Sequence, residues 1–256
     1  MNSNIQSNED PNFINKLPHI TAAFWIMKIT ATTLGETGGD WVSMTLNLGY
    51  LLSTLLFFTI FLVALGLQLS AVQHRPFLYW SVIVATSTAG TTMSDYMDRT
   101  LGLGYATGAA ILLSILICLL AMWRITVGDV SVDGIRTRKA EVFYWITILF
   151  SNTLGTALGD FLADDSGFGF LGSWLLISGA LAVILFATFH TRLSRVLLFW
   201  IAFILTRPFG ATFGDLLTKT QDKGGLDFGR GYSSLILLAI LLAVIYLSKG
   251  RTRSQK

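Results

Sequence analysis

The sequence contains unusually few charged residues. Only 13% of its 256 residues are Asp, Glu, Lys or Arg, whereas an average soluble domain has about 25%. The hydrophobic share is 53%, and long apolar segments occur at 51–67, 108–123, 173–189 and 233–247. Because a helix needs about 20 apolar residues to cross a bilayer, these values exclude an ordinary soluble domain. They predict an all-α integral membrane protein.

Cysteine and catalytic motifs are also scarce. The single cysteine, Cys118, lies inside an apolar segment, which excludes disulfides within the chain and thiolate metal clusters. No Ser–His or Cys–His set and no HExxH motif occurs within the expected helices, so we do not expect an enzyme. Nucleotide-binding motifs are absent too. Any transport would therefore depend on ion gradients.

One sixteen-residue frame, in contrast, occurs four times. Each copy begins with Trp, has Gly ten residues later and ends with Asp fifteen residues after the Trp. The copies are WIMKITATTLGETGGD (25–40), WSVIVATSTAGTTMSD (80–95), WITILFSNTLGTALGD (145–160) and WIAFILTRPFGATFGD (200–215). Such repetition marks a repeat protein. Together with the four apolar segments, the frames predict eight transmembrane helices, two in each repeat.

Two helices per repeat give every repeat the same orientation. The repeats are then expected to be related by an axis along the membrane normal. The Trp residues are 55, 65 and 55 residues apart, which favours pseudo-fourfold or two-plus-two symmetry. The expected segments are a cytoplasmic tail (1–17), repeat 1 (18–70), repeat 2 (71–123), a cytoplasmic linker (124–139), repeat 3 (140–190), repeat 4 (191–248) and a basic cytoplasmic tail (249–256).

Within each repeat, the loop after the Asp ends in Gly followed by an aromatic residue. The pairs are Gly49-Tyr50, Gly104-Tyr105, Gly169-Phe170 and, after seven extra residues, Gly231-Tyr232. The end of this loop is therefore expected at a corresponding position in all four repeats.

Basic residues are distributed unevenly between the two kinds of loop. Twelve of the 18 Lys and Arg residues fall in the tails or between repeats, whereas four (Arg99, Lys219, Lys223 and Arg230) fall in loops within repeats. Because basic loops stay in the cytoplasm, both termini are expected there, and each frame Trp is expected in an aromatic belt at that interface. Topology thus explains the net charge of +3 without a nucleic-acid partner.

The Trp, Gly and Asp residues of the four frames resemble those of a bacterial membrane-protein family. That family is built of four tandem two-helix repeats of unknown function, each with a Trp and a Gly-x-x-x-Gly-Asp-like motif. The resemblance covers nearly the whole chain outside the tails. It implies a multi-pass protein of the bacterial cytoplasmic (inner) membrane and carries no settled activity.

Polar residues line one face of each frame. Positions four and eight residues before the Asp share its helix face. They carry Glu36, Thr91, Thr156 and Ala211, and Thr32, Ser87, Asn152 and Arg207, respectively. Lys28 extends this face in the first frame. Because charged faces turn away from lipid, we expect an inner ring of four frame helices around a polar centre, with the apolar helices outside.

Three structural explanations compete with a functional one. Small residues at a spacing of four indicate close helix packing, at Gly35/Gly39, Gly90/Ser94, Gly155/Gly159 and Gly210/Gly214. The Asp residues lie near helix ends, where they can simply face water. A buried ion pair among Lys28, Arg207 and the acids would explain further charges. It leaves three negative charges over, because Glu36 and the four Asp residues face two bases.

An acidic, oxygen-lined centre without His or Cys is typical of a site for a hard cation. We predict a secondary transporter or channel for Mn²⁺, another divalent ion such as Mg²⁺, or an alkali ion such as Na⁺. Coupling to H⁺ would use Glu36, and no cofactor would be bound permanently. The predicted metal-binding residues are Glu36, Asp40, Asp95, Asp160 and Asp215; the predicted pathway residues are Lys28, Thr32, Ser87, Thr91, Asn152, Thr156 and Arg207. The partners are the lipid bilayer and a small inorganic ion, with a homo-oligomer as a further option.

Two other functions remain open at this point. Lys28 and Arg207 can hold a small anion or carboxylate in a transporter of a different kind. Alternatively, the protein is a membrane scaffold or sensor that transports nothing, in which the 124–139 loop binds a partner.

Overall fold

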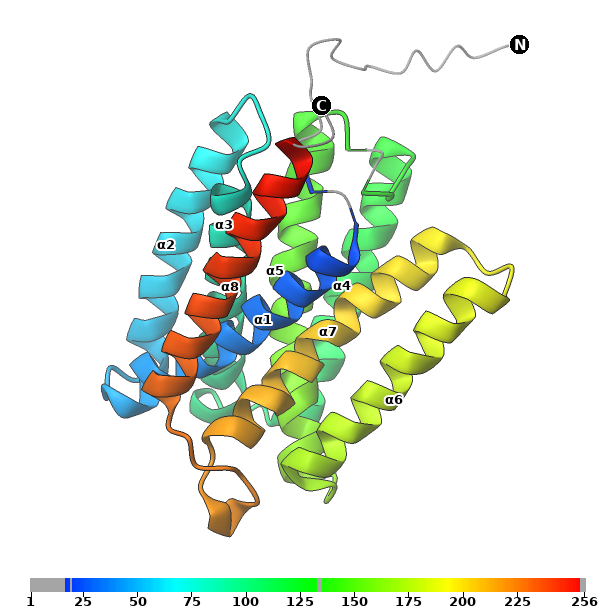
Figure 1. Ribbon diagram of the computed structural model, residues 1–256. Helices are drawn as coiled ribbons and strands as arrows, with labels where there is room; N and C mark the ends of the chain where they lie inside the picture. Colours follow the sequence, from blue (N-terminus) through cyan, green and yellow to red (C-terminus); the bar gives the residue numbers. More distant parts are fainter. Residues whose placement is uncertain (1–16, 19, 133–134, 254–256) are drawn as a thin grey trace, which may run out of the picture.

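The computed structural model describes residues 17–18, 20–132 and 135–253. Over these residues the protein is all α-helical, without strands, and contains the eight long helices that the sequence predicts. They are α1 (Ala22–Asp40), α2 (Tyr50–Ser70), α3 (Pro76–Asp95), α4 (Tyr105–Val127), α5 (Arg138–Asp160), α6 (Gly169–His190), α7 (Arg195–Thr218) and α8 (Arg230–Arg253) (Figure 1). At 1.5 Å per residue each is about 30 Å long, the thickness of a bilayer core.

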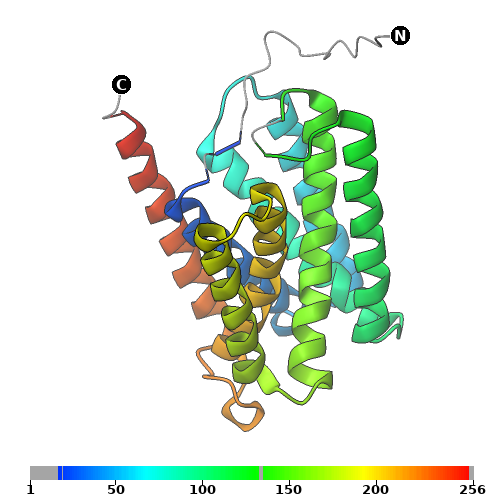
Figure 2. The same cartoon turned by 90° about the vertical axis from the view of Figure 1, so that its right-hand side faces the viewer.

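The odd-numbered helices form a closed ring. Helix α1 packs against α3, α3 against α5, α5 against α7, and α7 back against α1. Each even-numbered helix lies outside this ring, against the odd helix of the following repeat: α2 on α3, α4 on α5, α6 on α7 and α8 on α1. Figures 1 and 2 show α8 beside α1, where it closes the circle. This packing agrees with the inner ring predicted from the polar faces.

The even helices present apolar side chains to their surroundings. Six of the described helices, α2 and α4 to α8, are long and apolar enough to cross a membrane. Only 11% of the apolar window of α2 is buried inside the protein, against 72% for α5, so the even helices form the outer surface. Leu55, Val63 and Phe186 on that surface are more than half exposed. Apolar surface of this extent indicates a multi-pass membrane protein.

Glycines allow the odd helices to approach closely. Each frame glycine lies against the residue eight positions before the Asp of the next repeat: Gly35 on Ser87, Gly90 on Asn152, Gly155 on Arg207 and Gly210 on Thr32. A Cβ atom on Gly90 would lie 3.1 Å from Asn152 Cβ and 3.0 Å from the Thr153 nitrogen, closer than packed side chains normally come. The prediction that these glycines are packing residues is confirmed.

The odd helices do not all end in the same way. Three of them continue beyond the Asp as a π-helical turn, at Trp41–Thr45, Tyr96–Thr100 and Phe161–Asp165, whereas α7 stays α-helical to Thr218. The fourth loop instead contains a short 3₁₀ turn, Gln221–Lys223. The loop of repeat four is therefore the structural exception at this end of the ring.

A glycine with positive φ introduces the even helix of every repeat. These residues are Gly49 (76°), Gly104 (73°), Gly169 (65°) and Gly229 (77°), and glycine adopts this backbone conformation without strain. The choice of Gly231-Tyr232 for repeat four was wrong, because Gly231 lies inside α8. Arg230 therefore takes the position that Tyr50, Tyr105 and Phe170 occupy in the other repeats.

Aromatic residues close the opposite end of the ring. Every frame Trp follows a Phe or Tyr whose ring contacts the Trp of the next repeat. The ring centroids are 5.6 Å apart for Phe24–Trp80, 5.5 Å for Tyr79–Trp145, 6.4 Å for Tyr144–Trp200 and 5.8 Å for Phe199–Trp25. We call these eight residues the aromatic girdle. The predicted interfacial belt was wrong for Trp80, Trp145 and Trp200, which are at most 4% exposed and stabilise the ring from inside.

The close approach of α5 and α7 predicts the effect of a single methyl group. A Cβ on Gly155 would overlap Cβ and Cγ of Arg207, so Gly155→Ala should destabilise the protein by about 1–3 kcal/mol. Gly179→Ala on α6 is the matched control, because a Cβ there meets nothing within 4 Å. Thermal unfolding of the purified variants in detergent measures both. Equal unfolding temperatures for the two variants would contradict this account of the ring.

Candidate functional site

Arg207 fills the centre of the ring from α7. Its Nη1 and Nη2 each donate to Glu36 Oε2 on α1 at 3.1 Å. Its Nη2 also donates to the Ser87 carbonyl (3.3 Å) and the Thr91 hydroxyl on α3, and to the Thr156 hydroxyl on α5 (2.7 Å). One buried guanidinium thus contacts the three other odd helices. The buried ion pair considered from the sequence is formed by Arg207 and Glu36.

The side chain of Lys28 reaches across the ring from α1 to the opposite helix, α5. Its Nζ donates to Asn152 Oδ1 on α5 at 3.3 Å and lies 4.1 Å from the centroid of the Phe203 ring. The Asn152 amide donates in turn to the hydroxyls of Thr86 (2.9 Å) and Ser87 (3.3 Å) on α3. Polar side chains therefore connect both pairs of opposite helices, α1 with α5 and α3 with α7.

The seven predicted pathway residues share one buried environment. Six of them take part in the contacts of Arg207 and Lys28 described above. The seventh, Thr32, donates to the Lys28 carbonyl (3.0 Å) and to the Thr206 carbonyl on α7 (3.2 Å). All seven are 0% exposed. The structure thus brings together every residue that the polar faces singled out for the pathway.

Arg99 joins the carboxylates of repeats two and three. Its Nε lies 2.9 Å from Asp95 Oδ1, and its Nη2 donates to Asp160 Oδ2 at 3.3 Å. Its guanidinium also lies over the ring of Tyr105, 5.5 Å from the centroid, and reaches the Tyr50 hydroxyl at 3.5 Å. Burial alone would lower the pKa of Arg99, but Asp95 and Asp160 raise it, so the group is held as a cation.

Lys219 joins the carboxylates of repeats four and one. Its Nζ lies 3.2 Å from Asp215 Oδ1 and 3.8 Å from Asp40 Oδ2. Burial alone would lower the pKa of Lys219, but Asp215 and Asp40 raise it above its ordinary value. Arg230 adds a second base to Asp40, with its Nε 3.4 Å from Oδ2. The four Asp residues therefore form two pairs, each bridged by a basic residue.

Three of the five predicted metal-binding residues come together. Glu36, Asp160 and Asp215 each offer one carboxylate oxygen, and these oxygens lie within 4.8 Å of one another. Oxygen ligands of a single Ca²⁺ or Mg²⁺ ion lie at most about 5 Å apart, given metal–oxygen distances of about 2.0–2.6 Å. The three carboxylates, which come from α1, α5 and α7, therefore fit a hard cation. Asp40 and Asp95, the other two predicted ligands, lie outside this group.

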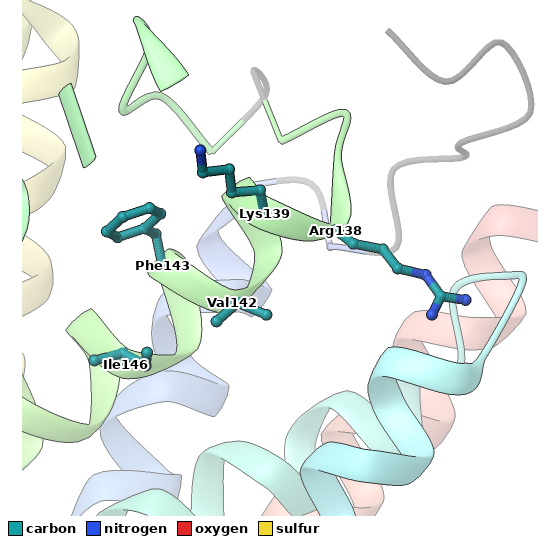
Figure 3. A pocket seen from close by; sticks show the side chains of 5 residues that line it. All are labelled: Arg138, Lys139, Val142, Phe143 and Ile146. Carbon is teal, nitrogen blue, oxygen red and sulfur yellow. The ribbon is translucent and has the colours of Figure 1, made fainter. Parts of the chain in front are cut away.

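A surface hollow of about 300 Å³ lies away from these residues, at the beginning of α5. Figure 3 shows its lining side chains, Arg138, Lys139, Val142, Phe143 and Ile146. These basic, aliphatic and aromatic side chains include no carboxylate or other metal ligand. We therefore assign the candidate site to the ring centre and its Asp end, and not to this hollow.

A protein-family model matches most of the chain. Its description is "Repeat of Unknown Function (DUF347)", and it matches residues 23–73, 78–129, 143–194 and 198–254. The chain belongs to this repeat family. No curated protein and no solved structure matches it. The four matched segments confirm the resemblance inferred from the frames, while the segment boundaries expected from the Trp spacing stay predictions.

The charge balance of this family member differs from the sequence-based expectation. Five acids were expected to face only Lys28 and Arg207, with three negative charges left over. That expectation was wrong, because three bases that lie outside the four frames pair with the Asp residues: Arg99, Lys219 and Arg230. Five carboxylates therefore face five bases, and the ring is formally neutral.

For two of these bases, the sequence contains a pattern that predicts the ion pair. Arg99 and Lys219 each follow the Asp of their own frame by four residues, the spacing of a helical ion pair. The equivalent positions in repeats one and three carry Met44 and Asp164. Bases thus alternate with other residues around the ring, which gives the Asp end a two-plus-two pattern. Arg230 has no such signal, because its partner Asp40 is 190 residues away.

The Arg207–Glu36 pair predicts a specific pattern of stabilities. Arg207→Met leaves Glu36 buried without its main partner and should cost about 3–5 kcal/mol in the free energy of unfolding. The double variant Glu36→Gln with Arg207→Met should lose less than the single one, since no charge is stranded. Unfolding in detergent measures both, with the exposed Arg195→Met on the same helix as control. A double variant less stable than Arg207→Met would contradict the assigned pairing.

Proposed function

We propose that the protein is a multi-pass membrane carrier for a hard inorganic cation. The cation would pass through the ring of odd helices, along an axis parallel to the membrane normal. The observation that carries the proposal is the group formed by Glu36, Asp160 and Asp215. Three buried carboxylates from three helices converge there within the coordination distance of one ion.

The membrane setting follows from the surface of the helix bundle. The apolar even helices would face lipid, and the more polar helices α1 and α3 would be shielded in the inner ring. Basic residues concentrate in the loops between repeats, on the side of the aromatic girdle. The positive-inside rule then puts the girdle and both termini on the cytoplasmic side of the bacterial inner membrane. The Asp residues would face the opposite side.

A carrier suits this ring better than an open channel. The side chains of Lys28 and Arg207 extend across the ring, from α1 to α5 and from α7 to α3, and both are 0% exposed. The aromatic girdle covers one end, while Arg99 and Lys219 cover the carboxylates at the other. A channel needs a continuous water-filled pore, whereas a carrier alternates between states that are open to one side of the membrane or to the other. The described conformation corresponds to a carrier closed at both ends.

The available ligands limit the kind of cation. Carboxylate and hydroxyl oxygens surround the centre, which favours Mg²⁺, Mn²⁺ or Na⁺ over ions that prefer sulfur or imidazole. Lys219 pairs with Asp215, and Arg99 with Asp160, at 3.2 and 3.3 Å. Both side chains are partly exposed and lie at helix ends, Arg99 in the π-helical turn after α3 and Lys219 directly after α7, so they can move outward when a cation takes their place.

Cation flux into liposomes tests this function directly. Purified protein should move at least one of Mn²⁺, Mg²⁺ and Na⁺ faster than empty liposomes, and Asp160→Asn should lower that flux at least tenfold because it removes a ligand and a charge. The exposed Asp165→Asn, at the end of the π-helical turn that follows Asp160, is the matched control and should retain flux. Wild-type flux equal to that of empty liposomes for all three ions would contradict the proposal.

A second candidate function, transport of a small anion, rests on two buried donors. Arg207 Nε has no hydrogen-bond partner in the described structure, and Lys28 Nζ contacts only an amide oxygen and a ring face. A carboxylate or halide between them would satisfy both donors. Thermal stabilisation by chloride or acetate that disappears in Arg207→Leu would favour this candidate over the cation carrier.

The scaffold alternative has less support. It needs the linker loop to be available to a partner, yet Val130 accepts a hydrogen bond from Trp200 Nε1 at 2.9 Å. Val132 and Ile135 of the same loop are buried in the hydrophobic core that also contains the aromatic girdle. These parts of the loop belong to the fold at the girdle end rather than to a free surface.

A further inference from the structure

Lys28 differs from every other base of the ring. Arg207, Arg99, Lys219 and Arg230 each have a carboxylate oxygen within 3.4 Å. Among the described residues, Lys28 has no carboxylate within ion-pair distance; its partners are Asn152 Oδ1 and the Phe203 ring. A buried ammonium with so little compensation is expensive to keep charged.

The other bases are poorly suited to releasing a proton. An arginine side chain keeps its charge in proteins, which removes Arg99, Arg207 and Arg230 from consideration. Lys219 lies between the carboxylates of Asp215 and Asp40, which stabilise its charged form. Lys28 is the one remaining base of the ring that can give up a proton without breaking an ion pair.

Few charged groups from α1 and its neighbours act on Lys28. On α7, Arg207 is itself a cation and pairs with Glu36, while Asp215 pairs with Lys219. On α1 itself, Glu36 is eight residues further along and bound to Arg207. Helix α8 has no charged side chain between Arg230 and Lys249. None of these groups compensates the charge of Lys28 directly.

Helices α3 and α5 supply polar but uncharged partners at this level. Of their carboxylates, Asp95 and Asp160 lie at the Asp end and both pair with Arg99, and Glu141 lies in the first turn of α5, at the girdle end. The two buried phenols, Tyr79 and Tyr144, bond to each other at 2.6 Å. Asn152 is therefore the direct polar partner of the amine from these helices.

We propose that Lys28 carries the proton that is exchanged for the transported cation. The proposal rests on the cation-carrier function above. Without a bound cation, five carboxylates balance five bases. A cation that enters among Glu36, Asp160 and Asp215 adds positive charge to this neutral ring. The Lys28 ammonium then dissociates to a neutral amine and H⁺, and the proton leaves to water on the side from which the cation entered. After the ring opens to the other side, the cation is released there and Lys28 binds a proton from that side, so that cation and proton exchange places across the membrane.

Glu36 is less suited to this role than the sequence suggested. Its Oε2 accepts hydrogen bonds from both Nη atoms of Arg207 and from the Thr91 hydroxyl at 3.2 Å. These donors stabilise the ionised carboxylate. Glu36 therefore serves as a fixed negative ligand, while the uncompensated amine of Lys28 responds to the cation.

Proton release on cation binding tests the role of Lys28. Purified protein in weakly buffered detergent solution is titrated with MnCl₂, MgCl₂ or NaCl, while a pH dye reports released protons and thermal stabilisation reports binding. Wild type should release about one proton more per bound cation than Lys28→Met, because binding and deprotonation are linked. Lys28→Arg, which keeps its charge, should bind the cation at least tenfold more weakly. The exposed Lys223→Gln should behave like wild type.

The outcomes separate this inference from the transport function. Equal proton release by wild type and Lys28→Met, with cation binding intact in both, overturns the role of Lys28 and leaves the carrier in place. Release that depends on Lys28 without flux in liposomes supports the role of Lys28 and overturns transport. Stabilisation by chloride rather than by cations, lost in Lys28→Met, overturns both. If Lys28→Met fails to fold, Lys28→Gln and Lys28→Arg provide the same comparison.

Discussion

The ring depends on one buried guanidinium. Arg207 cannot lose its charge, and a buried charge is tolerated only when ion pairing and hydrogen bonds replace water. Its acceptors are supplied by Glu36, Ser87, Thr91 and Thr156, which lie on the three other odd helices. The register of all four helices is therefore fixed at one level. Gly155 has to lack a side chain there because the stem of Arg207 lies against it.

The position of a residue relative to the axis explains which features are repeated. Trp, Gly and Asp lie at helix contacts or around the rim, where four equivalent places exist, so all four repeats carry them. At the levels four and eight residues before the Asp, one long side chain reaches the axis. These are Glu36 and Arg207, which occur once each, while the other repeats carry short Thr, Ser, Asn or Ala side chains at the same positions. Broken symmetry at the centre is thus a requirement of packing.

The frames and the four apolar segments were together sufficient to predict the eight helices, the inner ring and the packing role of the glycines, because each depends on a pattern along one helix. The basic bridges were missed because they depend on pairs from different repeats, such as Arg99 with Asp160. The aromatic girdle was missed for the same reason: Phe24 is visible beside Trp25, but its partner Trp80 belongs to the next repeat. The sequence alone does not show whether Gly229 or Gly231 precedes the fourth even helix. The positive φ of Gly229 identifies it as the equivalent of Gly49, Gly104 and Gly169.

Neutrality of the ring limits how any cation can enter it. An added positive charge must be compensated, either by moving a basic side chain outward or by losing a proton. At the Asp end, Arg99 and Lys219 are 27% and 12% exposed, so water screens part of any imbalance there. Around Lys28 and Arg207, both 0% exposed, the effective dielectric constant is lower and each uncompensated charge costs more. The largest electrostatic gain from deprotonation is therefore at the centre, where Lys28 lies without a carboxylate within ion-pair distance among the described residues.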